Sequence, residues 1–372
     1  MPASSGLRTF VRRIALVAFV AGLLPAAFAA AAAPASELPA ALDALVPALM
    51  EKHHVPGVSV AGIVDRQLAW TRQYGVRRAG RSEPVRPATL FEAASMSKPV
   101  GAYVALKLVE QGRLSLDRPL HEFLGRPYLP DEPLHLKITA RMVLTHTTGF
   151  PNWREGGWRK GGPLPVKSEP GTKFTYSGEG FTYLQRVIEH VTGESFEPFA
   201  QRTLLTPIGL TTGGFSWRES FRAIAAAGHN DRGEPMPSRE LYREANTAYS
   251  LYCSPQEYAA FLAEILRRDR SAPHSLRAET IAVMLTPVIE TPNPKPLVRA
   301  DGSAPLSTHY GLGWALDRTT RGQRVRHSGS NGTGFRCYCE FDPARGTGLV
   351  IMSNAVGGAA LWREVIEKLG AP

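Results

Sequence analysis

Strand-like segments occur at both ends of this 372-residue chain, and helix-like segments occupy the middle. Near the N-terminus, GVSVAGIV (57–64) and LAWTRQYGV (68–76) have the composition of strands and are joined by the turn-forming residues DRQ. Near the C-terminus, four further strand signals are HYGLGWALD (309–317), RVRHSG (324–329), FRCYCEFD (335–342) and GTGLVIMSN (346–354). We therefore expect an α+β fold in which an antiparallel sheet is built from both chain ends.

Helical spacing dominates the rest of the chain. A first helix is predicted over 37–53, with a kink or break at Pro47, and a second from Ser95 to Gln111, closing at Gly112. Further helical segments are ITARMVLTH (138–146), FTYLQRVIEHVTG (181–193), EPFAQRTLLTPIG (197–209), SPQEYAAFLAEILRR (254–268) and ALWREVIEKLG (360–370). We expect flanking helices on the sheet, a mostly helical lobe at about 113–285 inserted between the sheet halves, and a functional site at the seam.

The first 33 residues have the pattern of a secretory signal. VRR precedes the apolar run IALVAFVAGLL, and the small-residue stretch AAFAAAAAPAS follows it. Cleavage is predicted after Ala29 or at a position up to Ala33. This predicts a mature domain at 34–372, a periplasmic or secreted location, and no stable membrane insertion once the signal is removed. The alternative is an uncleaved membrane anchor.

Charge and cysteine content exclude several classes of partner. The net charge is +10, but the chain has no dense Lys/Arg run with interleaved aromatics, so nucleic acid is not an expected partner. The three cysteines, Cys253, Cys337 and Cys339, are too few for a disulfide scaffold, and no HExxH or paired CxxC spacing indicates a metal. We expect no metal and no cofactor, and a small-molecule or peptide substrate. The oligomeric state stays open.

The segment TLFEAASMSKPV (89–100) carries the first candidate site. Residues three apart on a helix lie on one face, so Lys98 is expected beside the hydroxyl of Ser95. The flanking residues are small and apolar, which indicates burial. A buried lysine loses its proton easily, and a neutral amine next to a hydroxyl is a general base. The spacing therefore favours an activated serine nucleophile over an exposed surface pair.

These residues resemble a known family. TLFEAASMSK is similar to the T-x-F-x-x-A-S-x-S-K block of the serine β-lactamase and penicillin-binding-protein superfamily, nearest its class C β-lactamase, D,D-peptidase and esterase branch. Four more blocks resemble that family in the same order: LTHTTGFPNW (144–153), PGTKFTYSGEGFTYLQ (170–185), YGLGW (310–314) and HSGSNGTGF (327–335). The resemblance implies a β-lactamase/transpeptidase-like fold and a serine hydrolase that acts through an acyl-enzyme.

The resemblance also implies residue roles. Ser95 is the expected nucleophile, Lys98 its proton acceptor, and Tyr176 the residue that passes the proton to the leaving group. His327, Ser328 and Gly329 match the family's K-T-G block, and His327 is expected to bind a carboxylate or help transfer protons. Ser330 is expected to offer a backbone N–H to the oxyanion together with Ser95. Two further expected substrate contacts lie at Trp153 and Gly178, whereas His146 is expected to be structural.

One position departs from the family pattern. Gly178 stands where the Y-x-N element has asparagine, whose amide holds the acylamino group of a substrate. Its absence favours small esters over penicillins, and Gly178→Asn is expected to improve acylation by β-lactams. Glu179 is read as a solvent-facing carboxylate rather than a substitute for that amide. The open alternatives are a D,D-carboxypeptidase or D-aminopeptidase acting on cell-wall peptides, and a non-catalytic penicillin-recognising protein.

Overall fold

The computed structural model describes residues 37–157, 159–237 and 241–371. The predicted signal at residues 1–33 lies outside the described residues. The domain boundaries proposed from the sequence, at 33/34 and at about 113 and 285, therefore stay predictions.

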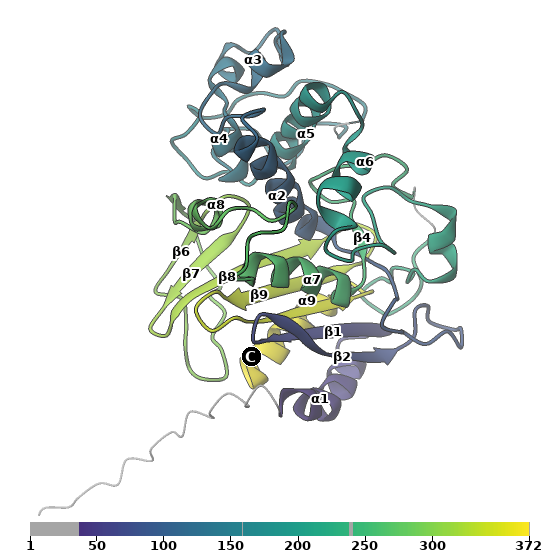
Figure 1. Cartoon of the computed structure of the whole chain (residues 1–372). Coiled ribbons are helices and arrows are strands. Elements are labelled where there is room, and N and C mark those ends of the chain that lie inside the picture. Colours follow the sequence, from purple (N-terminus) through teal and green to yellow (C-terminus); the bar gives the residue numbers. More distant parts are fainter. Residues whose placement is uncertain (1–36, 158, 238–240, 372) are drawn as a thin grey trace, which may run out of the picture.

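The core of the fold is an eight-stranded antiparallel sheet with the order β2-β1-β10-β9-β8-β7-β6-β5 (Figure 1). Strand β1 pairs with β10, with Val58 opposite Ser353 and Ile63 opposite Gly348, so strands from the two chain ends are direct neighbours, one strand in from the β2 edge of the sheet. The α+β arrangement with a sheet built from both ends is confirmed. The strands are β1 (Gly57–Val64), β2 (Gln67–Gly75), β5 (Ile289–Glu290), β6 (Ser307–Tyr310), β7 (Ala315–Thr319), β8 (Gly322–Ser330), β9 (Arg336–Asp342) and β10 (Thr347–Ser353).

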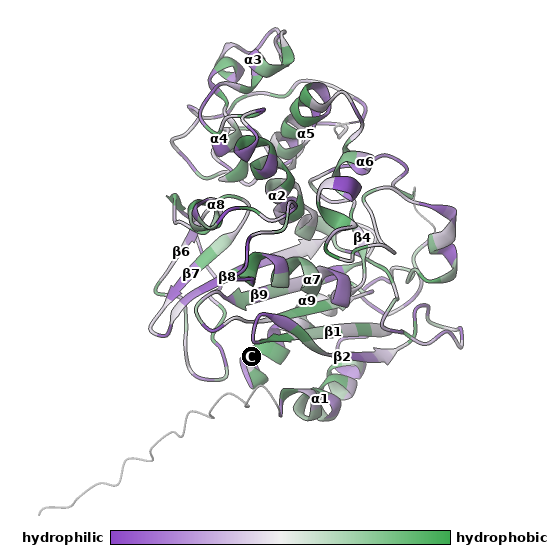
Figure 2. Cartoon of the chain, viewed as in Figure 1, coloured by the Kyte–Doolittle hydropathy of each residue, from purple (hydrophilic) through white to green (hydrophobic). Residues whose placement is uncertain are grey.

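Alternation along the strands explains why both faces of the sheet are covered. Leu349 and Ile351 of β10 join a cluster with helices α1 (Leu38–Lys52) and α9 (Gly358–Leu369). Val350 and Met352 belong to the core on the opposite face, where α7 (Pro255–Leu266) crosses in front of the sheet (Figure 1). Successive side chains point to opposite faces, so a run of apolar residues needs a helix layer on each side. In Figure 2, β1 is coloured mainly hydrophobic and the edge strand β2 mainly neutral or hydrophilic.

The helical region lies above one end of the sheet, between β2 and β5 in the chain (Figure 1). Its central element, α2 (Ser97–Glu110), is buried along nearly its whole length, as expected for a helix whose central part, residues 99–106, has no charged side chain. The other α-helices are α3 (Leu120–Leu124), α4 (Ala140–Leu144), α5 (Gly178–Thr192), α6 (Phe196–Ala200) and α8 (Ala278–Met284). Short elements are η1 (Ala94–Met96), η2 (Pro133–Lys137), η3 (Gln201–Leu205), η4 (Glu219–Ala223), β3 (Phe91–Glu92) and β4 (Tyr252–Cys253).

Several local predictions need correction. The segment 309–317, predicted as one strand, is divided between β6 and β7 by a turn in which Gly313 has φ +88°. A Cβ at Gly313 would also lie 2.7 Å from the Cβ of Ala102, so this turn sits directly on α2. The helix predicted from Ser95 begins with the 3₁₀ turn η1. Helix α1 continues through Pro47, so of the predicted kink or break only the break is wrong.

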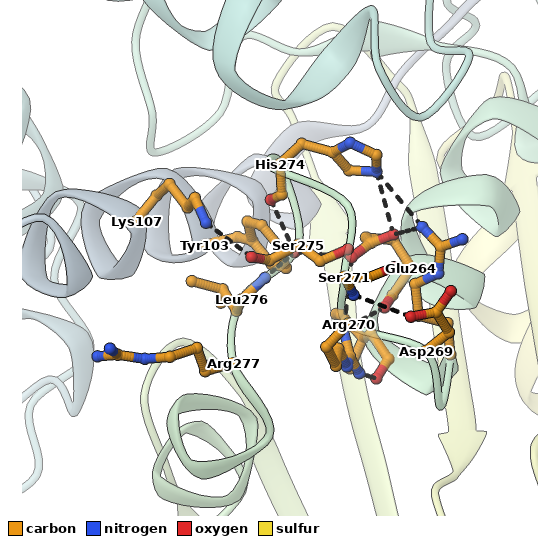
Figure 3. Close-up of polar contacts among 12 residues, drawn as sticks. Tyr103, Lys107, Glu264, Asp269, Arg270, Ser271, His274, Ser275, Leu276 and Arg277 are labelled. Carbon is orange, nitrogen blue, oxygen red and sulfur yellow. Dashed lines mark hydrogen bonds and ion pairs between the residues drawn. The ribbon is translucent and has the colours of Figure 1, made fainter.

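A polar cluster fastens α2 to α7 and to the segment that follows α7 (Figure 3). The Tyr103 hydroxyl donates to Glu264 Oε1 at 2.9 Å and accepts from the Leu276 N–H at 2.9 Å. The Glu264 carboxylate is buried, and Arg267 and Arg270 donate to it at 3.1 and 3.4 Å. A buried carboxylate is tolerated only with such partners. The cluster therefore holds the helix that carries Lys98 against the helix layer on the sheet.

Candidate active site

Ser95 lies in the short helix η1, two residues before α2 begins. Its neighbour Ala94 has φ +51° and is fully buried. A left-handed conformation is unfavourable for alanine and persists only where the surrounding structure holds it. The turn leaves Ser95 partly exposed, whereas Ala93, Ala94 and Met96 around it are buried. The backbone thus exposes the Ser95 hydroxyl to solvent, while the residues around it are buried.

Lys98 lies beside this hydroxyl, as its spacing predicts. Its Nζ is 3.2 Å from Ser95 Oγ and 2.7 Å from the carbonyl oxygen of Ala248, and its side chain is 1% exposed. Burial lowers the pKa of Lys98 to about 7. In the neutral state, one N–H donates to Ala248 and the lone pair is free to accept the Ser95 proton. Lys98 can therefore act as a base at neutral pH.

Tyr176 lies beside both Lys98 and Ser95. The Lys98 Nζ is 4.8 Å from the centre of its ring. Burial raises the pKa of Tyr176, and a hydrogen bond to Ser95 lowers it only in part. The resting residue is therefore a phenol, which has a proton to give and an oxygen to accept one. The structure brings Ser95, Lys98 and Tyr176 together, as the sequence predicts.

His327 is buried on β8, and both of its ring nitrogens have partners. Nδ1 lies 2.8 Å from the carbonyl oxygen of Ser328, which can only accept, so Nδ1 carries the proton. Nε2 then accepts from the Tyr310 hydroxyl at 3.0 Å. Burial, followed by the nearby charge of Lys98, lowers the pKa of His327 to about 3. A neutral ring whose two nitrogens both have partners does not suit the expected role of His327 in binding a carboxylate. The other expected role, proton transfer, is compatible with the contact to Tyr310.

Gly329 explains why β8 runs so close to the nucleophile. A Cβ at this position would lie 2.1 Å from the carbonyl oxygen of Ala93, so only glycine allows β8 to pack on η1. Ser328 and Ser330, its exposed neighbours, line the cleft together with Ser95. The end of β8 thus lies alongside the nucleophile, in the place where the backbone N–H of Ser330 is expected to meet an oxyanion.

The cleft has two arms that meet at Ser95, Asn152 and Ser330. The larger arm, about 510 Å³, runs past Tyr176, Tyr310 and His327 towards the loop at 291–292. The smaller arm, about 310 Å³, extends past Lys98 and Trp153 to the loop at 331–332. Two arms on either side of a nucleophile suit the acyl and leaving-group parts of one substrate.

Trp153 and Gly178 are far apart in the sequence but lie in direct contact in the structure. A Cβ on Gly178 would lie 2.5 Å from two atoms of the Trp153 ring. The indole therefore covers the position where the family asparagine would project. The expectation that Gly178→Asn alone improves the site stays a prediction, and the contact shows that the new side chain requires the indole to move.

Asn152 is a site residue that the sequence reasoning missed. Its Oδ1 accepts from the Gly178 N–H at 2.9 Å, and the residue lines both arms of the cleft. Since the oxygen is used by the backbone, the amide nitrogen is the group left for a ligand. Asn152 thus offers an amide donor next to the position where the family asparagine is absent. Tyr310 was also missed, and both residues belong to sequence blocks that pointed to the family.

Glu179 was predicted to face solvent, and this is wrong. Its side chain is fully buried and forms an ion pair with Arg154, whose Nη2 donates at 2.7 Å and whose Nε donates at 3.0 Å. The backbone N–H of Arg154 donates to the other carboxylate oxygen at 3.1 Å. The pair ties the loop that carries Asn152 and Trp153 to the start of α5. Glu179 therefore shapes the cleft wall without lining the cleft.

The remaining predictions concern groups elsewhere in the chain. The three cysteines are buried and unpaired. Across residues 37–157, 159–237 and 241–371, no group of three or more His, Cys, Asp or Glu side chains is arranged to bind a metal ion. Nor does that part of the chain contain a helix with the length and apolar character that crossing a membrane requires.

Comparison with known proteins gives consistent matches. Residues 42–368 match the family described as Beta-lactamase. The chain is 25% identical over 346 residues to penicillin-binding protein 4 of Amycolatopsis lactamdurans, covering 87% of this chain and 88% of that protein. It is 30% identical over 250 residues to esterase EstB of Burkholderia gladioli, covering 59% of this chain and 61% of the esterase.

Solved structures share the fold. The D-alanine carboxypeptidase AmpC of Burkholderia cenocepacia superposes with a TM-score of 0.72 at 20% identity, covering 90% of this chain and 99% of that one. At this identity the likeness concerns the fold alone. It extends over both sheet halves and the helical region between them.

Proposed function

The chain belongs to the Beta-lactamase family and is a serine hydrolase of it, and we propose that it hydrolyses small carboxylic esters through an acyl-enzyme on Ser95. The observation that carries this proposal is the 3.2 Å contact between Ser95 Oγ and the buried amine of Lys98. A hydroxyl needs such a base to become a nucleophile. A non-catalytic binding protein would have no need of that base.

The reaction is a two-step acyl transfer. Ser95 Oγ attacks the ester carbonyl while its proton passes to Lys98, and the backbone N–H groups of Ser95 and Ser330 stabilise the oxyanion. When the C–O bond to the alcohol breaks, the leaving oxygen takes a proton from the Tyr176 hydroxyl, which regains one from Lys98. Water then attacks the acyl-enzyme by the same route in reverse.

The preference for esters rests on the wall of the smaller arm. The Trp153 ring occupies the space next to Gly178, where an acylamino side chain of a penicillin would be held. A small acyl group needs neither that space nor an amide contact. The likeness to an esterase over 59% of this chain is in keeping with this preference.

A second candidate is hydrolysis of D-amino-acid peptides, as in a D,D-carboxypeptidase. The observation that favours it is Asn152, which offers an amide donor to both arms of the cleft. The larger arm, about 510 Å³, has room for a peptide residue, and Thr308 and Arg326 line it. Esterase and peptidase activity would share the same nucleophile and oxyanion contacts.

We also propose that the protein works outside the cytoplasm, in the periplasm or the medium. The support is the apolar, small-residue N-terminal segment at residues 1–33. Intact mass of the protein recovered from periplasmic and secreted fractions tests this. A mature chain starting between residues 30 and 34 is expected, whereas full-length protein held in the membrane would contradict it.

Mass spectrometry after labelling tests the activity. The protein is incubated separately with a fluorophosphonate, a p-nitrophenyl short-chain ester and a penicillin, and the same is done with Ser95→Ala. We expect a stoichiometric phosphonyl adduct and ester turnover that Ser95→Ala loses, with slow or absent penicillin hydrolysis. Labelling of Ser95→Ala would overturn the assignment of the nucleophile. Faster turnover of penicillin or of a D-alanyl peptide than of esters would overturn the substrate preference.

A further inference from the structure

His146 lies directly behind Tyr176 and has an unusual backbone. It follows α4, is fully buried, and has φ +56°. A left-handed backbone conformation costs a residue other than glycine roughly 1–2 kcal/mol, so the surroundings must hold it in place. A side chain that only fills space does not require this geometry.

His146 contacts the residues on both sides of Tyr176 in the chain, and its ring lies against the ring of Tyr176. Its carbonyl oxygen accepts from the N–H of Thr175 at 2.7 Å, and its ring Nδ1 accepts from the N–H of Ser177 at 3.1 Å. Its ring centre lies 4.2 Å from the ring centre of Tyr176. A single residue thus fixes the backbone on both sides of Tyr176 and also contacts the face of its ring.

The protonation state of His146 follows from these contacts. Because Nδ1 accepts from an N–H, it carries no proton, and the neutral ring has its proton on Nε2. Burial, followed by the nearby charge of Lys98, keeps the pKa of His146 well below its usual value. Nε2 has no hydrogen-bond partner among the described residues, and the ring of Tyr310 lies nearly edge-on at 4.9 Å. The imidazole is therefore a fixed acceptor that adds no second cation beside Lys98.

We propose that His146 is a positioning residue for proton transfer by Tyr176, holding the phenol at the place where it meets the leaving group. This inference rests on the proposed acyl-enzyme mechanism. An apolar residue would fill the same volume, but it could not accept from the Ser177 N–H. It would therefore leave that buried donor unpaired and the Tyr176 segment free to shift.

The proposal separates substrates by their leaving group. An alkoxide must be protonated as the C–O bond breaks, so an ethyl ester needs Tyr176 in place. A p-nitrophenolate departs without a proton and needs it far less. Displacing a proton donor by a fraction of an ångström therefore slows only the reactions that depend on it.

Two substitutions separate the contributions of His146. His146→Phe keeps a ring but removes the acceptor, whereas His146→Asn keeps a short acceptor and tolerates a positive φ but removes the ring. We expect His146→Phe to lower kcat/KM for an ethyl ester about 10- to 100-fold more than for the p-nitrophenyl ester. His146→Asn should show the same selective loss to a smaller extent, and it serves as the test if His146→Phe does not fold.

His229 is a matched control. It is also fully buried, and its Nε2 accepts from a backbone N–H, that of Ala79, at 3.0 Å, but it lines neither arm of the cleft. His229→Phe should leave the ratio of the two ester rates unchanged. Equal losses on both esters in the His146 variants, or a changed ratio in His229→Phe, would overturn the proposal. Wild-type protein that neither turns over esters nor takes up fluorophosphonate at Ser95 would instead overturn the proposed function.

Discussion

The protonation of Lys98 determines when Ser95 can react. Among the residues that the structure describes, no carboxylate pairs with the amine to hold its proton, and burial lowers its pKa to about 7. Near pH 7 a large fraction of the amine is therefore deprotonated and able to accept a proton. A lysine of this kind can take the place of the histidine base of other serine hydrolases.

This predicts a simple pH profile. A base is active only when unprotonated, so kcat/KM should rise about tenfold per pH unit below a midpoint near 7 and level off above it. His327 titrates at about 3 and should not contribute between pH 5 and 9. The profile is measured with a p-nitrophenyl ester. A residual rate in Lys98→Ala that keeps the same midpoint would contradict the assignment.

The pair of Gly178 and Trp153 gives a second prediction. Gly178→Asn forces the new side chain into an indole whose nearest atoms are 2.5 Å from its Cβ position, and overpacking of this kind destabilises by about 1–3 kcal/mol. We expect a loss of stability in urea unfolding and no gain in penicillin acylation. Adding Trp153→Ala should restore stability and speed that acylation.

Gly180→Ala is the control for this pair, because a Cβ at Gly180 makes ordinary contacts, the nearest at 3.5 Å from Thr148. It should leave stability and activity nearly unchanged. Faster penicillin acylation by Gly178→Asn alone, without loss of stability, would show that Trp153 moves aside freely.

At the scale of elements, the site depends on how closely β8 approaches η1. No hydrogen-bond ladder joins a strand to the start of a helix, so the distance between them is fixed by side-chain volume. Gly329 on β8 and the carbonyl of Ala93 before η1 meet at this seam. In the proposed mechanism, the backbone N–H groups of Ser330 and Ser95 meet the substrate oxyanion at this seam.

Gly329→Ala should therefore damage catalysis more than folding. Its Cβ would lie 2.1 Å from the Ala93 carbonyl oxygen, which forces β8 away from η1. Loss of one oxyanion donor lowers kcat by roughly 100- to 1000-fold in serine hydrolases. We expect a loss of this order in acylation by a p-nitrophenyl ester, with Gly180→Ala again unaffected. A normal rate of acylation in Gly329→Ala would contradict the proposal that β8 supplies an oxyanion donor.

At the scale of the whole molecule, the two chain ends form one structural unit. Helix α1 from the N-terminal end and α9 from the C-terminal end pack together on the face of the sheet away from α7. Leu42 and Leu361, one from each helix, are fully buried in the cluster between them. The proposed catalytic residues lie on the other face, so we expect that stability and catalysis can be separated by mutation.

Leu361→Ala tests this separation. Removing a buried leucine side chain destabilises by about 2–5 kcal/mol, because the lost contacts leave a cavity. We expect a loss of this size in urea unfolding, with kcat/KM unchanged below the transition. Leu306, which is 62% exposed, is the control, and Leu306→Ala should change the free energy of unfolding by less than about 0.5 kcal/mol. Lowered activity in folded Leu361→Ala would contradict the separation.

Much of this architecture was accessible from the sequence alone. The strand-like segments at both chain ends predicted the antiparallel sheet, and the helical segment 254–268 predicted α7, whose first turn is closed by a capping box between Ser254 and Glu257. The family resemblance drawn from five sequence blocks is confirmed by the match over residues 42–368. The i, i+3 spacing of Ser95 and Lys98 predicted their contact. These features are local, because backbone geometry and side-chain period over a few residues determine them.

Other features depended on contacts between distant segments. Whether Glu179 faces solvent is decided by Arg154, 25 positions earlier, and the space at Gly178 by the ring of Trp153. The hydrogen-bond donor to His327 Nε2 is the Tyr310 hydroxyl, which comes from another strand. Sequence patterns report which face of an element is buried, but not which side chain fills the space opposite. For this protein the sequence determined the fold and the groups that we propose to react, and the tertiary structure alone decided the shape and hydrogen bonding of the cleft around them, because loop packing sets both.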